Sequence, residues 1–235
     1  MRYKNVIGGI FLSRPNRFIA QVLINGKEET VHVKNTGRCR ELLIKGAEVW
    51  LEISDNPQRR TKYDLIAVKK ERGELPSLII NMDSQVPNAA AAEWLEKCGM
   101  FPDTAVIERE KTYGDSRFDI RITDGDRLSF MEVKGVTLEH GGIASFPDAP
   151  TERGVKHLNG LIRLAEQGFG AYLLFVVQMK GITKFRPNDE THREFGDTLR
   201  KAAASGVKCM AYDCIVEPDS ICIDSEVPIE LFGEK

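Results

Sequence analysis

Hydrophobic and polar residues alternate with a period of two through most of the first 80 residues, the pattern of half-buried β-strands. Asn25-Gly26 predicts a hairpin turn, and residues 38–44 allow one helical turn. The alternation predicts five short strands, at residues 18–24, 29–33, 48–53, 63–68 and 77–80. Five strands in this length predict a small β-barrel of the OB type, as a first domain over residues 1–82.

From residue 83 onward, helical and strand patterns follow one another. Helices are predicted from alanine-rich composition or from apolar spacings of three and four, at residues 89–97, 151–167 and 188–205. Strands are predicted at residues 104–109, 117–122, 128–138, 172–178 and 207–212. Residues 172–178 are almost wholly apolar, as in a strand covered on both faces. Three strands followed by alternating helices and strands predict an α/β second domain over residues 83–235, a mixed sheet flanked by helices.

Charge is divided unevenly between the two predicted domains. Residues 1–80 contain 15 Lys and Arg against 9 Asp and Glu, whereas residues 81–235 contain 18 against 26, for a net charge of −2. A basic first domain favours phosphate binding, and an acidic second domain can gather carboxylates. Chance asymmetry is the alternative.

The sequence shows no feature of a membrane or exported protein. No run reaches the roughly 18 apolar residues of a membrane helix. Residues 1–15 lack the apolar core of a signal peptide. The five cysteines include no Cys-x-x-Cys pair, which favours free thiols. We therefore expect a cytoplasmic protein with no membrane partner.

The clearest candidate chemistry lies in Asp119, Glu132 and Lys134. A tight turn at Asp124-Gly125 folds the strand of Asp119 back on the strand of Glu132, so the two carboxylates converge. The two-residue period places Glu132 and Lys134 on the same face. A Glu-x-Lys sequence is also common as an exposed charge pair, but apolar residues flank Glu132 on both sides in this chain.

Two neighbouring carboxylates repel each other, and a bound cation relieves that repulsion. Oxygen ligands select a hard cation, so we expect Mg²⁺ or Mn²⁺. Such an ion can activate water, and Lys134 can position that water or balance charge in the transition state. This combination predicts phosphodiester hydrolysis.

The spacing of Asp119 and Glu132-Val133-Lys134, after one helix and within three strands, resembles the PD-(D/E)xK nuclease superfamily and in particular archaeal Holliday-junction resolvases. Phe118 stands where the name of the superfamily has proline, a position that varies. Many members add an acid from the first helix, and Glu93 is the candidate for this third metal ligand, ahead of Glu96. A solvated helix carboxylate is the alternative reading of Glu93.

The whole chain resembles the sugar fermentation stimulation protein A (SfsA) family. The resemblance rests on residues 35–38, 116–119, 131–138 and 146–158. It implies an N-terminal OB-like domain, a C-terminal nuclease-like domain and non-specific DNA binding. It also implies a regulatory role in sugar metabolism, notably that of maltose.

Several residues are candidates for nucleic-acid binding. In the first domain they are Lys34, Asn35, Thr36, Arg38 and Arg40, and a second basic stretch at residues 59–63 carries Tyr63 as a base-stacking candidate. In the second domain Arg153, Lys156 and His157 follow Thr151, an N-cap residue, at a helix start that favours anions. Solvated loops, and for His157 a core or surface role, are the alternatives. Residues 140–150 are expected to form a long loop that closes over substrate or is disordered.

Two functions follow from these residues. The first is a metal-dependent nuclease that acts on DNA, with RNA as the alternative substrate. The second is a non-catalytic DNA-binding regulator built on a nuclease scaffold. The residues give no support to sugar binding, and they leave the oligomeric state open, with a dimer among the options.

Overall fold

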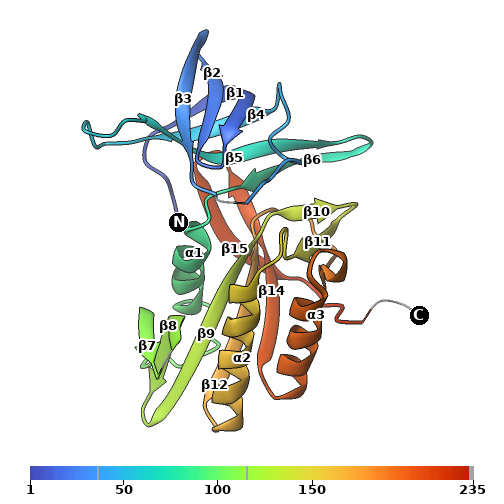
Figure 1. Cartoon of the computed structure of the whole chain (residues 1–235). Helices are drawn as coiled ribbons and strands as arrows, with labels where there is room; N and C mark the ends of the chain where they lie inside the picture. Colours follow the sequence, from blue (N-terminus) through green and yellow to red (C-terminus); the bar gives the residue numbers. More distant parts are fainter. Residues whose placement is uncertain (36, 115, 233–235) are drawn as a thin grey trace.

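The computed structural model describes residues 1–35, 37–114 and 116–232. It shows two domains stacked end to end (Figure 1). The N-terminal domain is built from β1 (Val6–Asn16), β2 (Ile19–Ile24), β3 (Lys27–Val33), β4 (Glu48–Ile53), β5 (Tyr63–Arg72) and β6 (Leu75–Asn81). Strand β3 pairs with β2 and also, in parallel, with β5. This second pairing closes the sheet into the small barrel that the alternation predicts.

Strand β1 is absent from the prediction. Gly8-Gly9 and Pro15 read as strand breakers in the sequence. In the barrel, however, Gly9 faces the neighbouring strand so closely that a Cβ atom would lie 2.6 Å from Cγ1 of Val22. The glycine therefore permits a close approach of two strands. Residues 38–44, which were predicted to allow one helical turn, contain one such turn, in which Leu43 N donates to Cys39 O at 2.9 Å.

The C-terminal domain contains the predicted mixed sheet and helices. Its helices are α1 (Val86–Leu95), α2 (Glu152–Glu166) and α3 (Asp189–Ala204). The strands of its large sheet are β7 (Val106–Tyr113), β8 (Ser116–Asp124), β9 (Arg127–Val136), β12 (Gly170–Val177), β14 (Lys208–Glu217) and β15 (Ser220–Glu226). They lie in the order β15-β14-β12-β9-β8-β7, and the three central strands run parallel.

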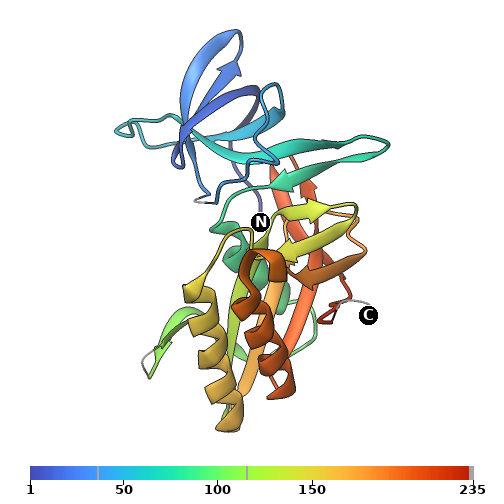
Figure 2. The ribbon, with the colours of Figure 1, turned by 45° about the vertical axis from the view of Figure 1, so that its right-hand side comes forward.

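Helix α1 covers one face of this sheet, and α2 and α3 lie together on the other (Figures 1 and 2). The central strand β12 serves both layers. Phe175 belongs to the core cluster that contains Leu158 of α2, whereas Leu174 and Val176 belong to the cluster that contains Ala91 of α1. Burial on both faces explains why this strand reads as a continuous apolar run.

The predicted loop at residues 140–150 is in part regular structure, which corrects the sequence prediction. β10 (Leu138–His140) and β11 (Ile143–Phe146) form a hairpin, and β13 (Lys184–Pro187) pairs with β11 in parallel. Gly141 and Gly142 make the turn with φ angles of 58° and 84°. Strands this short, stabilised by a distant partner, carry little alternation of their own.

The two domains are joined by more than the link between β6 and α1. The N-terminal residues cross to the second domain, where Arg2 bridges to Ser220 and Tyr3 N donates to Asp219 O at 2.8 Å. On the opposite side of the junction, Lys70 of β5 pairs with Glu139 of β10 at 2.6 Å. No helix in the described part of the chain is long and apolar enough to span a membrane.

Candidate functional site

Asp119 and Glu132 lie side by side on the antiparallel strands β8 and β9. The register pairs Ile120 with Met131, which places the two acids at neighbouring positions. The backbone N of Val133 donates to Asp119 Oδ2 at 2.8 Å, so the aspartate is held against the strand of Glu132. The Glu132 side chain is 2 % exposed. The structure therefore brings the predicted acid pair together, with Glu132 buried and Asp119 half-buried.

Lys134 and His157 both contact the same oxygen of Glu132. Lys134 Nζ donates to Oε1 at 2.5 Å, and His157 Nδ1 also bonds to this atom. Arg153 Nε donates to His157 Nε2 at 3.3 Å. Because Nε2 accepts, the proton of a neutral ring sits on Nδ1 and is donated to Glu132. His157 thus supports the acid pair from helix α2.

The surroundings separate the two acids in their affinity for a proton. Burial raises the pKa of Asp119, and the negative charge of Glu132 raises it further. Burial also acts to raise the pKa of Glu132, but the hydrogen bond from His157 and the charge of Lys134 outweigh it, so this pKa is lowered. Glu132 is therefore the more firmly ionised member of the pair.

This donor set fits a divalent cation. Two adjacent carboxylates that raise each other's energy are what a hard cation stabilises, with water completing its ligand shell. Asp119 and Glu132 would hold such an ion. Within the described residues, no group of three His, Cys, Asp or Glu side chains is placed to bind a metal. The protein would thus supply two carboxylates and leave the other positions to water or substrate.

The structure does not bring Glu93 to this pair. Its carboxylate is 54 % exposed and binds the N-terminal ammonium of Met1 at 2.6 Å. Asn88 of the same helix faces the acids instead, and its Nδ2 donates to Asp119 Oδ1 at 2.9 Å. Five residues of helix turn a side chain about 140° away, so one helix cannot direct both residues to the site. Asn88 carries an amide and not a carboxylate, so a pattern of acidic residues in the sequence does not point to it.

A hollow of about 240 Å³ opens beside Glu132. We call it the helix hollow, because its lining includes Arg153, Lys156 and His157 of α2 together with Glu132. Thr151 caps the helix by accepting from Gly154 N at 3.0 Å. Arg153 and Lys156 are exposed. The structure thus places all three predicted residues of this helix next to the acid pair.

Arg38 and Arg40 of the first domain are exposed in a second hollow, of about 390 Å³. We call it the arginine hollow, because Arg14 and Arg17 line it as well. The Arg14 guanidinium donates to the carbonyl oxygens of Arg17, Asn35, Gly37 and Arg38, at 2.7–2.9 Å. Arg14 therefore shapes the loop that presents the other arginines, a role that a lone Arg before a proline does not reveal in the sequence.

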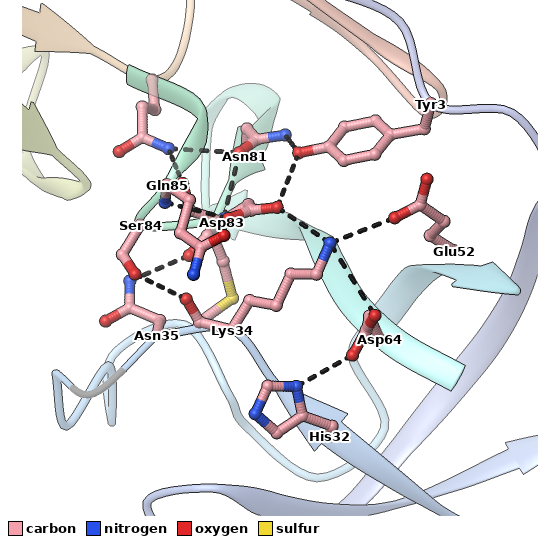
Figure 3. A network of polar contacts seen from close by, with 12 residues as sticks. Tyr3, His32, Lys34, Asn35, Glu52, Asp64, Asn81, Asp83, Ser84 and Gln85 are labelled. Atoms are coloured by element: carbon pink, nitrogen blue, oxygen red, sulfur yellow. Dashed lines mark hydrogen bonds and ion pairs between the residues drawn. The ribbon is translucent and has the colours of Figure 1, made fainter. Parts of the chain in front are cut away.

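Lys34 is placed differently from the other predicted basic residues. Figure 3 shows its ammonium directed at Glu52, Asp64 and Asp83, with distances of 3.1, 3.7 and 3.3 Å. Asp83 follows the barrel, so this contact ties the two domains together. The ammonium of Lys34 is therefore already paired with three carboxylates, with which a phosphate would have to compete.

The neighbours of Lys34 are also engaged within the protein. Asn35 donates to Met82 O at 3.0 Å and accepts from Gly37 N at 2.7 Å. Thr36 lies outside the described residues. In the second basic stretch, Arg59 binds Asp64, and Tyr63 is only 9 % exposed, which leaves its ring little room to stack on a base.

Comparison with known proteins covers both domains. Residues 85–220 match the sugar fermentation stimulation protein RE domain, and residues 12–78 match the SfsA N-terminal OB domain, which confirms the OB prediction. Sugar fermentation stimulation protein homologs of Desulfitobacterium hafniense and Clostridium beijerinckii are 54% and 52% identical over 231 residues. These matches span 98% of this chain and 99% and 100% of the relatives. The structure of Pyrococcus furiosus SfsA in complex with Ca²⁺ matches with a TM-score of 0.84 at 28% identity, covering 98% of both chains.

Proposed function

Because the chain belongs to the sugar fermentation stimulation protein family, we propose that it binds DNA and hydrolyses phosphodiester bonds at Asp119 and Glu132. The observation that carries the proposal is the adjacent acid pair with Lys134 on the buried Glu132 and a cationic hollow alongside. Mg²⁺ or Mn²⁺ is the proposed cofactor. The Ca²⁺ in the structure of the Pyrococcus furiosus relative supports a divalent cation in this protein.

The side chains around the pair suit distinct tasks. A bound metal would supply an activated water and polarise the phosphate. Lys134 Nζ lies where it can hold that water or stabilise negative charge on the phosphate. Arg153 and Lys156 can bind the phosphate oxygens, and the Nδ1 proton of His157 keeps the Glu132 carboxylate oriented.

A non-catalytic DNA-binding regulator is the second candidate. Glu132 Oε1 already has two donors, Lys134 and His157, so its charge is balanced without a metal. The arginine hollow would serve DNA binding in either case. The name of the family suggests a link to sugar metabolism, which the regulator would provide.

One experiment separates these functions. The purified full chain is incubated with Mn²⁺ or Mg²⁺ and a panel of single-stranded, duplex and branched DNA and matching RNA, beside Glu132→Ala and the control Glu93→Ala. The nuclease proposal expects cleavage that Glu132→Ala abolishes and Glu93→Ala retains. Equal cleavage by wild type and Glu132→Ala contradicts it. Salt-sensitive binding without cleavage, unchanged in Glu132→Ala, supports the regulator.

A further inference from the structure

A cavity of about 290 Å³ lies at the junction of the two domains. We call it the inter-domain cavity. Most of its polar lining is made of amides and hydroxyls from both domains and from the link between them, namely Asn35, Ser84, Thr137, Ser145, Thr151 and Gln178. Among the described residues that line it, Asp148 alone carries an ionisable side chain. The chemistry of this cavity therefore suits a neutral ligand that forms hydrogen bonds.

Two largely buried residues that line this cavity, Gln178 and Thr137, each carry a side-chain oxygen atom that accepts no hydrogen bond within the described residues. Gln178 is 2 % exposed, and its Nε2 donates to Asn81 Oδ1 and Asp83 O, both at 3.1 Å. In the described part of the chain, no hydrogen bond reaches Gln178 Oε1 or the hydroxyl of Thr137, which is 8 % exposed. Both residues line the cavity, so these oxygens are ready to accept hydrogen bonds from a ligand.

Gln178 Oε1 is also directed at the strand that carries the acid pair. A Cβ atom added to Gly135 would lie 2.4 Å from it, so only glycine leaves room for the amide there. Gly135 follows Lys134 directly, and three residues of strand separate it from Glu132 by about 10 Å. The cavity and the proposed reaction centre are therefore connected by one strand, β9.

The inter-domain cavity adjoins a cationic hollow on each side. Gly37 lines both this cavity and the arginine hollow. On the other side, Thr151 lines the cavity and caps the helix whose first turns form the helix hollow. The resulting order is a cationic hollow, a cavity whose side chains are uncharged apart from Asp148, and a second cationic hollow. That order matches the phosphate, base and phosphate of one nucleic-acid strand.

We propose that the inter-domain cavity binds one unpaired base of the nucleic acid, with flanking phosphates in the arginine and helix hollows. This inference rests on the proposed function. Every base carries an N–H on its Watson–Crick edge, which Thr137 Oγ1 and Gln178 Oε1 can accept. In a duplex that edge is occupied by the partner base. The preferred substrate is thus single-stranded or locally opened DNA or RNA.

The test compares a fluorescein-labelled mixed-sequence 12-mer of single-stranded DNA with its duplex, by anisotropy with the full chain in Ca²⁺ at fixed salt. Ala149→Trp fills the cavity from its rim, and Ala204→Trp places the same ring on the exposed end of α3 as a control. Thr137→Val removes one acceptor without changing size. We expect tighter binding of the single strand, weakened at least tenfold by Ala149→Trp and several-fold by Thr137→Val. The affinity for duplex DNA should change less than twofold in these variants. The affinity of Ala204→Trp for the single strand should also stay within twofold of the wild-type value.

Equal affinity for single strand and duplex, unaltered by Ala149→Trp, overturns the proposal. The proposal is also overturned if maltose displaces the oligonucleotide more effectively than a nucleoside does. The ligand of the cavity would then be a sugar. The binding measurement does not depend on whether the protein cleaves the nucleic acid. Selective loss in Ala149→Trp supports the cavity even if no substrate is cleaved. Duplex cleavage that depends on Glu132 but not on Ala149 retains the nuclease and rejects the cavity.

Discussion

Asn88 Nδ2 donates a 2.9 Å hydrogen bond to Oδ1 of Asp119. The helix that was expected to supply a third carboxylate thus supplies an amide. An amide supports the ionised aspartate without adding a third negative charge to the two adjacent carboxylates. The proposed metal site therefore has two protein carboxylates, and Asn88 orients one of them.

Replacing Asn88 with alanine should weaken Mn²⁺ binding. Loss of a hydrogen bond that orients a metal ligand typically costs roughly 10–100-fold in affinity. Isothermal titration with Mn²⁺ measures the effect, and Glu93→Ala on the same helix is the control, expected to bind as wild type does. A larger loss in Glu93→Ala than in Asn88→Ala would return Glu93 to the site.

Neutralising Arg38 and Arg40 together should weaken DNA binding and reduce its dependence on salt. On duplex DNA, each phosphate contact adds about 0.9 to the steepness with which log affinity falls against log salt. Loss of both arginines should therefore make this slope shallower by about 2. The control is Arg193→Ala, whose side chain is 85 % exposed on α3. An unchanged slope in the double variant would show that the arginine hollow does not contact phosphate.

The pairing of Lys70 with Glu139 should stabilise the whole chain. The Glu139 side chain is fully buried, and Lys70→Ala removes one charged donor while Arg72 and Gly142 N remain, which should cost roughly 1.5–3 kcal/mol. The adjacent Lys69 pairs with exposed Glu71, so Lys69→Ala should cost much less stability. Urea unfolding of the two variants gives both values, and equal losses would mean that this inter-domain ion pair adds nothing special.

Asp64 should contribute stability that acid removes. Burial raises its pKa, but hydrogen bonds from Arg59 and His32 and the charge of Lys34 outweigh burial, so the pKa is lowered. A carboxyl with a lowered pKa in the folded state contributes fully above its unfolded pKa of about 3.9 and less as pH falls through the folded value. Asp64→Asn should cost roughly 1.5–3 kcal/mol at pH 7, because the hydrogen bonds from Arg59 and His32 lose their charged acceptor.

The difference between wild type and Asp64→Asn should therefore shrink below about pH 4. Urea unfolding at neutral pH and at two acidic values measures this trend. A difference that stays constant across that range would mean that the charge of Asp64 is not what matters.

Much of the fold follows from local patterns. The helix and strand order of the second domain and the closed barrel of the first were predicted from periodicity and turn residues. The strands β1, β10, β11, β13 and β15 were not. Glycines, short length and polar composition hide them, since their stability comes from partners far away in the chain.

For the site, the sequence by itself determined that Asp119, Glu132 and Lys134 meet, because one tight turn between two strands sets their register. Only the tertiary structure decided which other residues join them. Asn88 in place of Glu93, His157 on Glu132, and Lys34 among three carboxylates all depend on how a helix is rotated or how two domains dock. Such contacts join positions tens of residues apart, and no local period records them.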